Sequence, residues 1–145
     1  MWFNKNDILK YQVNNIDINI DNLHGYVLPH AGTKHTGHIL SHTLRFKPTK
    51  SFTNILIIYL PVHSKPNVEN YYHEYYVPYK ALKLFYPNKK FIGYNTNSNH
   101  TSDPNINTNI SKLTKENTLF IISADFSHFL SINNAIKKEN CAAHS

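Results

Sequence analysis

The sequence is poor in the residues that build secreted scaffolds, membrane spans and fibres. Its only cysteine, Cys141, cannot form an internal disulfide, which fits a reducing compartment and excludes a disulfide-rich scaffold. No apolar run approaches the roughly 20 residues of a transmembrane helix, and the first ten residues lack the apolar stretch of a signal peptide. Only four glycines are present, which excludes a collagen-like fibre. We therefore expect a cytoplasmic protein without a membrane partner.

Positive charge is present but is not concentrated in any segment. The formal charge is +6, and the only tight groups of lysines are the pairs at 89–90 and 137–138. A nucleic-acid surface usually shows a basic block, so we expect no nucleic-acid partner. The ten histidines are more unusual, because neutral imidazole is a good ligand for transition metals.

The length of 145 residues and the 41% hydrophobic content fit one domain with a single core. Apolar segments predict strands at residues 25–29, 54–60, 90–94 and 118–123. Helices are predicted over residues 36–46, from Pro78 to residue 85, over 109–116 and over 132–143, with a flexible loop at 95–109. Strands that alternate with helices indicate an α/β fold with a mostly parallel sheet flanked by helices.

Three of the predicted strands each run directly into a histidine, namely His30, His63 and His128. Ligands bind outside the carboxyl ends of parallel strands, so these imidazoles are expected to converge on a Zn or Fe ion. Asp125, three residues before His128, would orient a ligand imidazole or serve as a base. The alternative is that all of them are ordinary loop residues of a histidine-rich chain.

A second group of histidines lies within one predicted helix. His35, His38 and His42 are spaced three and four residues apart, which places them on one helical face. This pattern predicts a solvated face, with a second metal site as the less favoured alternative. His24 precedes a strand, at the wrong end of the sheet, and is interpreted as structural.

Three further residues are candidate contributors to the site. His73 and Glu74 have no partner at a recognised spacing, although their segment follows His63 and can lie near the same site. Cys141 is interpreted as a buried small residue rather than as a thiolate ligand.

Four segments, in order along the chain, resemble the Memo family, whose members are relatives of the LigB-type class III extradiol dioxygenases. They are Leu28-Pro-His-Ala-Gly32, Ile57-Ile-Tyr-Leu-Pro-Val-His63, Glu74-Tyr-Tyr-Val-Pro-Tyr79 and Leu119-Phe-Ile-Ile-Ser-Ala-Asp-Phe-Ser-His128. In that family the corresponding motifs follow successive strands of an α/β/α core. The resemblance covers nearly the whole chain, from about residue 25 to residue 128.

The resemblance implies that His30 and His63 are metal ligands and that His128 lines the same pocket. The dioxygenase branch of the family uses non-haem Fe(II) to cleave catechol-type rings. The Memo branch has a similar fold, with iron or copper binding and redox roles implied.

The chain also departs from the family pattern. A typical member is about twice as long, and its third metal ligand, a Cys or a Glu, lies in the half that is missing here. We therefore interpret residues 1–145 as a single, partial Memo-like domain, in which Asp125, Glu74 or Cys141 would replace that ligand.

Together these features predict a metal-dependent, dioxygenase-like oxidoreductase. His30, His63 and His128 are expected to bind a divalent metal, Fe before Cu or Zn, with His128 and Asp125 as acid–base residues. The alternatives are a non-catalytic domain that binds phosphorylated peptides and a degenerate fragment with an incomplete sheet. The expected partners are a small molecule or a peptide, and a homodimer in which a second copy provides the absent ligand.

Overall fold

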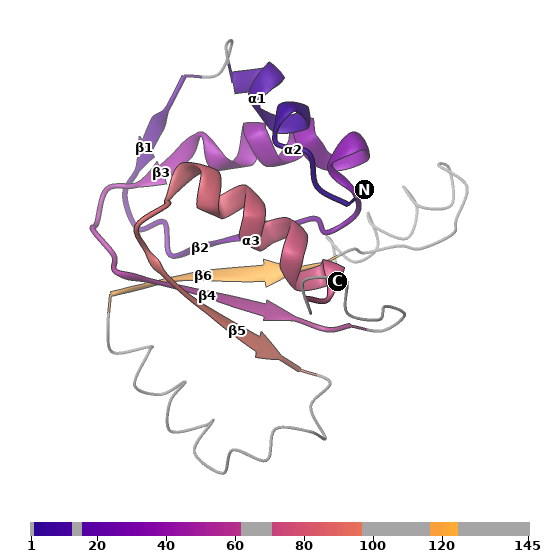
Figure 1. The fold of residues 1–145 in the computed structure, drawn as a ribbon. Coiled ribbons are helices and arrows are strands. Elements are labelled where there is room, and N and C mark those ends of the chain that lie inside the picture. Colours follow the sequence, from indigo (N-terminus) through magenta and orange to yellow (C-terminus); the bar gives the residue numbers. More distant parts are fainter. Residues whose placement is uncertain (1, 13–15, 62–70, 97–116, 125–145) are drawn as a thin grey trace, which may run out of the picture.

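The computed structural model describes residues 2–12, 16–61, 71–96 and 117–124. Its centre is a four-stranded sheet with the order β2-β6-β4-β5, in which every neighbouring pair is parallel (Figure 1). The strands are β2 (Gly25–Leu28), β4 (Asn54–Tyr59), β5 (Lys90–Asn95) and β6 (Thr118–Ser123). The predicted α/β fold with a mostly parallel sheet is confirmed.

The strand order has a direct consequence for the site. β6 is the last described strand in the sequence, yet it lies between β2 and β4. Because the three strands are parallel neighbours, their carboxyl ends lie at one edge of the sheet. This is the arrangement of strands that the prediction of a common histidine edge requires.

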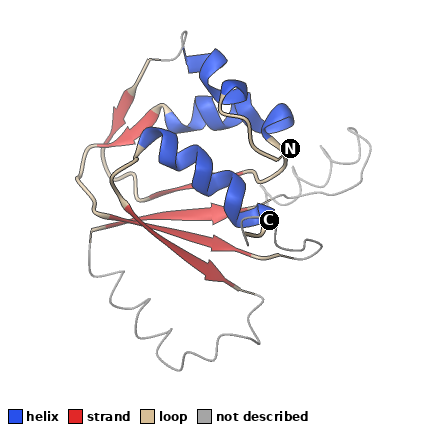
Figure 2. Cartoon of the chain, in the orientation of Figure 1, coloured by secondary structure: helices blue, strands red, loops and turns tan. Residues whose placement is uncertain are grey.

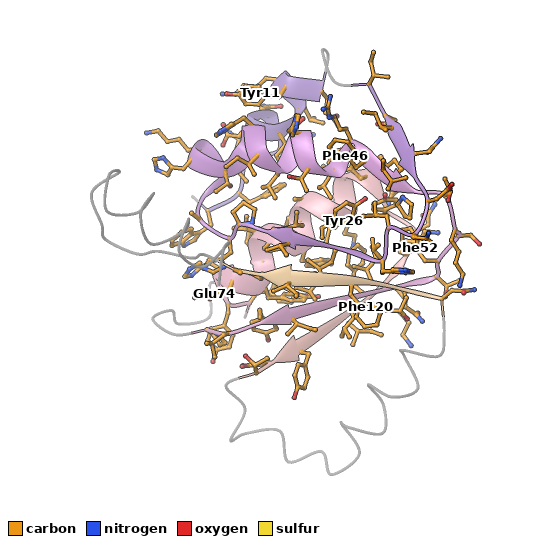
Figure 3. The ribbon with its side chains drawn as sticks, turned by 180° about the vertical axis from the view of Figure 1, so that it is seen from behind. Tyr11, Tyr26, Phe46, Phe52, Glu74 and Phe120 are labelled. Carbon is orange, nitrogen blue, oxygen red and sulfur yellow. The ribbon has the colours of Figure 1, made fainter. Side chains whose placement is uncertain are left out.

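Three helices lie on one side of the sheet: α1 (Asn6–Gln12), α2 (Thr33–Leu44) and α3 (His73–Phe85) (Figures 1 and 2). The core lies between these helices and the sheet, where Tyr26 of β2 is also buried (Figure 3). Its fully buried members include Leu40, Leu44, Val77, Leu82, Ile55, Ile57 and Ile121. Among the described residues no helix is long and apolar enough to cross a membrane.

The opposite face of the sheet is less well covered by the described residues. Val27 and Ile122, which are register partners on β2 and β6, are 51% and 48% exposed. The helices predicted over 109–116 and 132–143 and nearly all of the loop predicted at 95–109 lie outside the described residues.

The start of α3 differs from the prediction. The helix begins at His73, so Pro78 lies in its interior and does not start it. Proline is typical of the first helical turn because it has no N–H to donate, and this preference suggested the later start. The helix tolerates Pro78 because the carbonyl of Glu74, one turn earlier, receives a hydrogen bond from outside the helix.

Three short elements were not predicted from the sequence. β1 (Ile18–Ile20) and β3 (Phe46–Pro48) form a separate two-stranded parallel sheet, and α1 packs against α2. The strands have only three residues each, which is too short to show an alternating pattern. β3 occupies the end of the segment predicted as helix 36–46; α2 itself begins at Thr33 and ends at Leu44.

The contact between α1 and α2 requires a glycine. A Cβ atom at Gly37 would lie 2.2 Å from the carbonyl oxygen of Asp7, far closer than a van der Waals contact. The absence of a side chain at this position lets the two helices approach closely.

We predict that Gly37→Ala lowers the free energy of unfolding by about 1–3 kcal/mol, because the new methyl group pushes α1 away from α2. This loss exceeds the gain of about 1 kcal/mol that alanine brings to a helix interior. Chemical denaturation followed by circular dichroism measures it. The control is Lys34→Ala, an exposed position on the same helix, with an expected change within about 0.5 kcal/mol. A Gly37→Ala variant as stable as the parent would contradict the prediction.

Candidate metal centre

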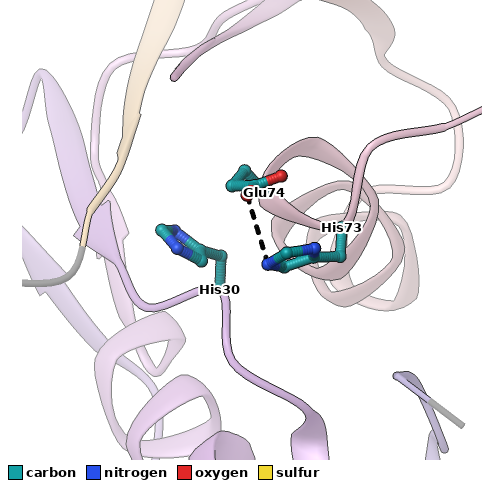
Figure 4. Close-up of side chains that lie close together, drawn as sticks. All are labelled: His30, His73 and Glu74. Atoms are coloured by element: carbon teal, nitrogen blue, oxygen red, sulfur yellow. Dashed lines mark ion pairs between the residues drawn. The ribbon is translucent and has the colours of Figure 1, made fainter. Parts of the chain in front are cut away.

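Three elements meet at the carboxyl edge of the sheet. His30 lies in the turn between β2 and α2, Ser123 ends β6, and His73 and Glu74 begin α3 (Figure 4). His30 is 8% exposed and Glu74 is 2% exposed, so the imidazole and the carboxylate are both largely removed from water. Burial of a carboxylate is costly unless its charge is compensated, which makes this position unusual in the core.

The side chains of His30, His73 and Glu74 form a compact group of donors. One ligand atom from each residue lies within 4.8 Å of the other two. The Nε2 atom of His73 lies 3.2 Å from Oε1 of Glu74, and the rings of His30 and His73 have centroids 5.6 Å apart. Two ligand atoms at about 2.1 Å from one metal ion lie roughly 3.0–3.4 Å apart in octahedral or tetrahedral geometry. The His73–Glu74 pair has this spacing, so the group of three donors could hold a metal ion.

The hydroxyl of Ser123 connects the strand, the helix and the histidine turn. Since Pro78 has no N–H for the carbonyl of Glu74, Ser123 Oγ donates to that carbonyl at 2.5 Å. Ser123 Oγ also lies 3.0 Å from Nδ1 of His30. Because the hydroxyl proton points to Glu74, Ser123 accepts from Nδ1–H of His30. This tautomer places the imidazole lone pair on Nε2, the atom that a metal would use.

The carboxylate of Glu74 benefits from its place in the helix. Glu74 is the second residue of α3, where the helix dipole favours negative charge, and the N-cap residue Tyr72 makes no side-chain cap. His73 is the neighbouring cation when it is protonated. A divalent metal ion between these residues would compensate the same buried charge without protonation of either imidazole.

A short N-terminal segment, Trp2 to Asn4, reaches both elements that carry the donor side chains. Trp2 stacks on His73, with ring centroids 4.2 Å apart and planes 4° from parallel. The carbonyl of Trp2 accepts a hydrogen bond from the backbone N–H of Thr33, and the N–H of Asn4 donates to the Thr33 hydroxyl. Phe3 meets Tyr76 of α3 edge to face. The segment therefore links the start of α2, just after His30, to the start of α3.

Tyrosines near the start of α3 do not compete as anionic ligands. Burial raises the pKa of Tyr59, and the neighbouring Tyr72 and Glu74 raise it further. Burial also raises the pKa of Tyr75, again with additions from nearby tyrosines. Both phenols are neutral at physiological pH. Among the described residues at this edge, Glu74 therefore provides the carboxylate of the donor group.

The structure places some of the predicted site residues and leaves others open. His30 lies at the expected edge, next to Glu74, which was one of the three residues named as a replacement for the third ligand. His63, Asp125, His128 and Cys141 lie outside the described residues, so their predicted roles stay predictions.

The sequence reasoning gave Ser123 and Trp2 no role, and it named His73 only as a residue that can lie near the site. A helix that begins before Pro78 would have made His73 a stronger candidate, because adjacent His and Glu residues then share the first turn. The contact of Ser123 with His30 joins residues 93 positions apart, and no local pattern signals it.

Comparisons with protein-family models, with curated proteins and with solved structures find no match for this chain.

We predict that Ser123→Ala lowers the free energy of unfolding by about 1–3 kcal/mol, because it removes a partner from two buried polar groups. The same change releases the tautomer of His30, which nitrogen-15 NMR of the imidazole detects as a mixture. Ser123→Thr keeps the hydroxyl and should keep both the tautomer and most of the stability. If Ser123→Ala leaves His30 in the Nδ1–H form, the hydroxyl does not set the tautomer.

Proposed function

We propose that this protein binds one divalent metal ion through His30, His73 and Glu74 and uses it in Memo-like redox chemistry. The observation that carries the proposal is a buried carboxylate grouped with two imidazoles, with one donor atom of each within 4.8 Å of the others. Two histidines and one carboxylate form the donor set of non-haem Fe(II) oxygenases, so iron is the first candidate and copper or zinc the next.

Each residue has a separate task in this proposal. Glu74 would neutralise one charge of the cation, and the Ser123 hydroxyl holds Nδ1–H of His30, which leaves the lone pair of Nε2 for a metal ion. Trp2 restricts the ring of His73 by stacking on it. A bound ferrous ion would provide redox chemistry at the coordination positions that three protein ligands leave open.

The proposed centre differs from the pattern of the Memo family in two of its ligands. The family motif assigns the second histidine ligand to the position of His63, whereas the group in hand uses His73, with Glu74 as the anionic ligand. His73 and Glu74 are the first two residues of α3. In this proposal the complete donor set lies within residues 30–74.

The test is metal content and Fe(II) affinity of the full chain, prepared without chelators. We expect about one equivalent of metal at this centre, with Glu74→Gln weakening Fe(II) binding at least about tenfold, as loss of a charged ligand should. Trp2 is the only tryptophan, and it stacks on a ligand ring, so its fluorescence reports anaerobic Fe(II) titration. His73→Ala removes that stacking partner and is therefore followed by elemental analysis.

The matched control is His24→Ala, which removes an exposed histidine at the other end of β2 and should leave Fe(II) binding unchanged. Unaltered metal content and affinity in both Glu74→Gln and a His30→Ala, His73→Ala double variant would overturn the proposed centre. A metal-free protein with the same circular dichroism and melting behaviour would instead favour the non-catalytic binding domain.

A further inference from the structure

The outward face of α2 carries three histidines that take no part in the centre at the sheet edge. His35, His38 and His42 are all exposed, whereas Leu40 and Leu44 on the opposite side of the helix are buried in the core. The structure therefore confirms that these imidazoles share the solvent-facing side of one helix, as their spacing of three and four residues predicts.

The spacing of His38 and His42 suits a chelate. Residues four apart on a helix have Cβ atoms about 5–6 Å apart, and two imidazoles so placed can bind one ion. Both histidines are exposed, with Tyr11 of α1 beside His38 and Phe46 beside His42, each at a centroid distance of 5.9 Å.

The local charge selects the class of ion. α2 has no acidic residue, and Lys34 lies one turn before His38. Hard cations such as Ca²⁺ and Mg²⁺ need oxygen ligands, and α2 has no carboxylate to provide them. Borderline ions that prefer imidazole nitrogen, namely Cu²⁺, Ni²⁺ and Zn²⁺, suit it better.

We propose that His38 and His42 form a second, surface metal site for a borderline divalent ion, with water at the remaining coordination positions. His35 provides an alternative partner for His38, three residues away on the same face. His38 is therefore the shared member of both pairs. The site contains none of the residues of the proposed redox centre.

Calorimetric titration of the full chain with Ni²⁺ tests this site independently of the first. We expect two binding events, of which Glu74→Gln weakens one and His38→Ala weakens the other at least about tenfold through loss of the chelate. His42→Ala should have a smaller effect, because the His35–His38 pair stays in place. His24→Ala, the loss of an exposed histidine outside the helix, should leave both events unchanged.

A second comparison separates spacing from the number of histidines. In a His35→Ala background, exchange of His42 and Thr43 keeps two imidazoles on α2 but moves them five residues apart, off a common face. The surface event should then be lost, whereas His35→Ala alone should retain it. If His38→Ala leaves the titration unchanged, or if the exchanged variant binds as tightly as its parent, the surface site is refuted. If the unaltered chain shows the His38-dependent event but no event that Glu74→Gln weakens, only the redox centre is refuted.

Discussion

The arrangement at the sheet edge depends on the hydroxyl of Ser123. This group is nearly buried, and it joins the end of β6 to the Glu74 carbonyl on α3 and to the imidazole of His30. Pro78 has no N–H to donate to the Glu74 carbonyl, and the Ser123 hydroxyl donates to it instead. One side chain therefore fixes the relative position of three segments and also the tautomer of a candidate ligand.

The sheet topology is what makes this contact available. β6 lies between β2 and β4, so its last residue, Ser123, lies beside the turn that follows β2. Ser123 and His30 are in contact there although they are 93 positions apart in the sequence. On the other side of the site, the Trp2 segment contacts both α2 and α3. These contacts join segments far apart in the sequence, so the group of His30, His73 and Glu74 is a product of tertiary structure rather than of a local motif.

The main strands could be predicted from the sequence, but the grouping of His30 with His73 and Glu74 could not. Continuous apolar runs such as residues 54–60 have few interpretations other than a buried parallel strand, and the strands confirm this. Pro78 misplaced the start of α3, because the usual preference of proline for a first turn assumes that no side chain replaces its missing hydrogen bond. That error placed His73 and Glu74 in a predicted loop instead of in the first turn of a helix. The position of His30 could be predicted because it follows a strand, whereas its partners come from other elements.

The two proposed sites would bind metal for different physical reasons. At the sheet edge, Glu74 is buried and two imidazoles are held by Ser123 and Trp2, so the ligands are arranged before the ion arrives and the ion compensates a buried charge. On α2, the histidines are solvated, no carboxylate is present, and binding must order the side chains. The buried centre should therefore hold its ion more tightly and accept harder metals, whereas the helix face should exchange ions readily and depend on imidazole chemistry alone.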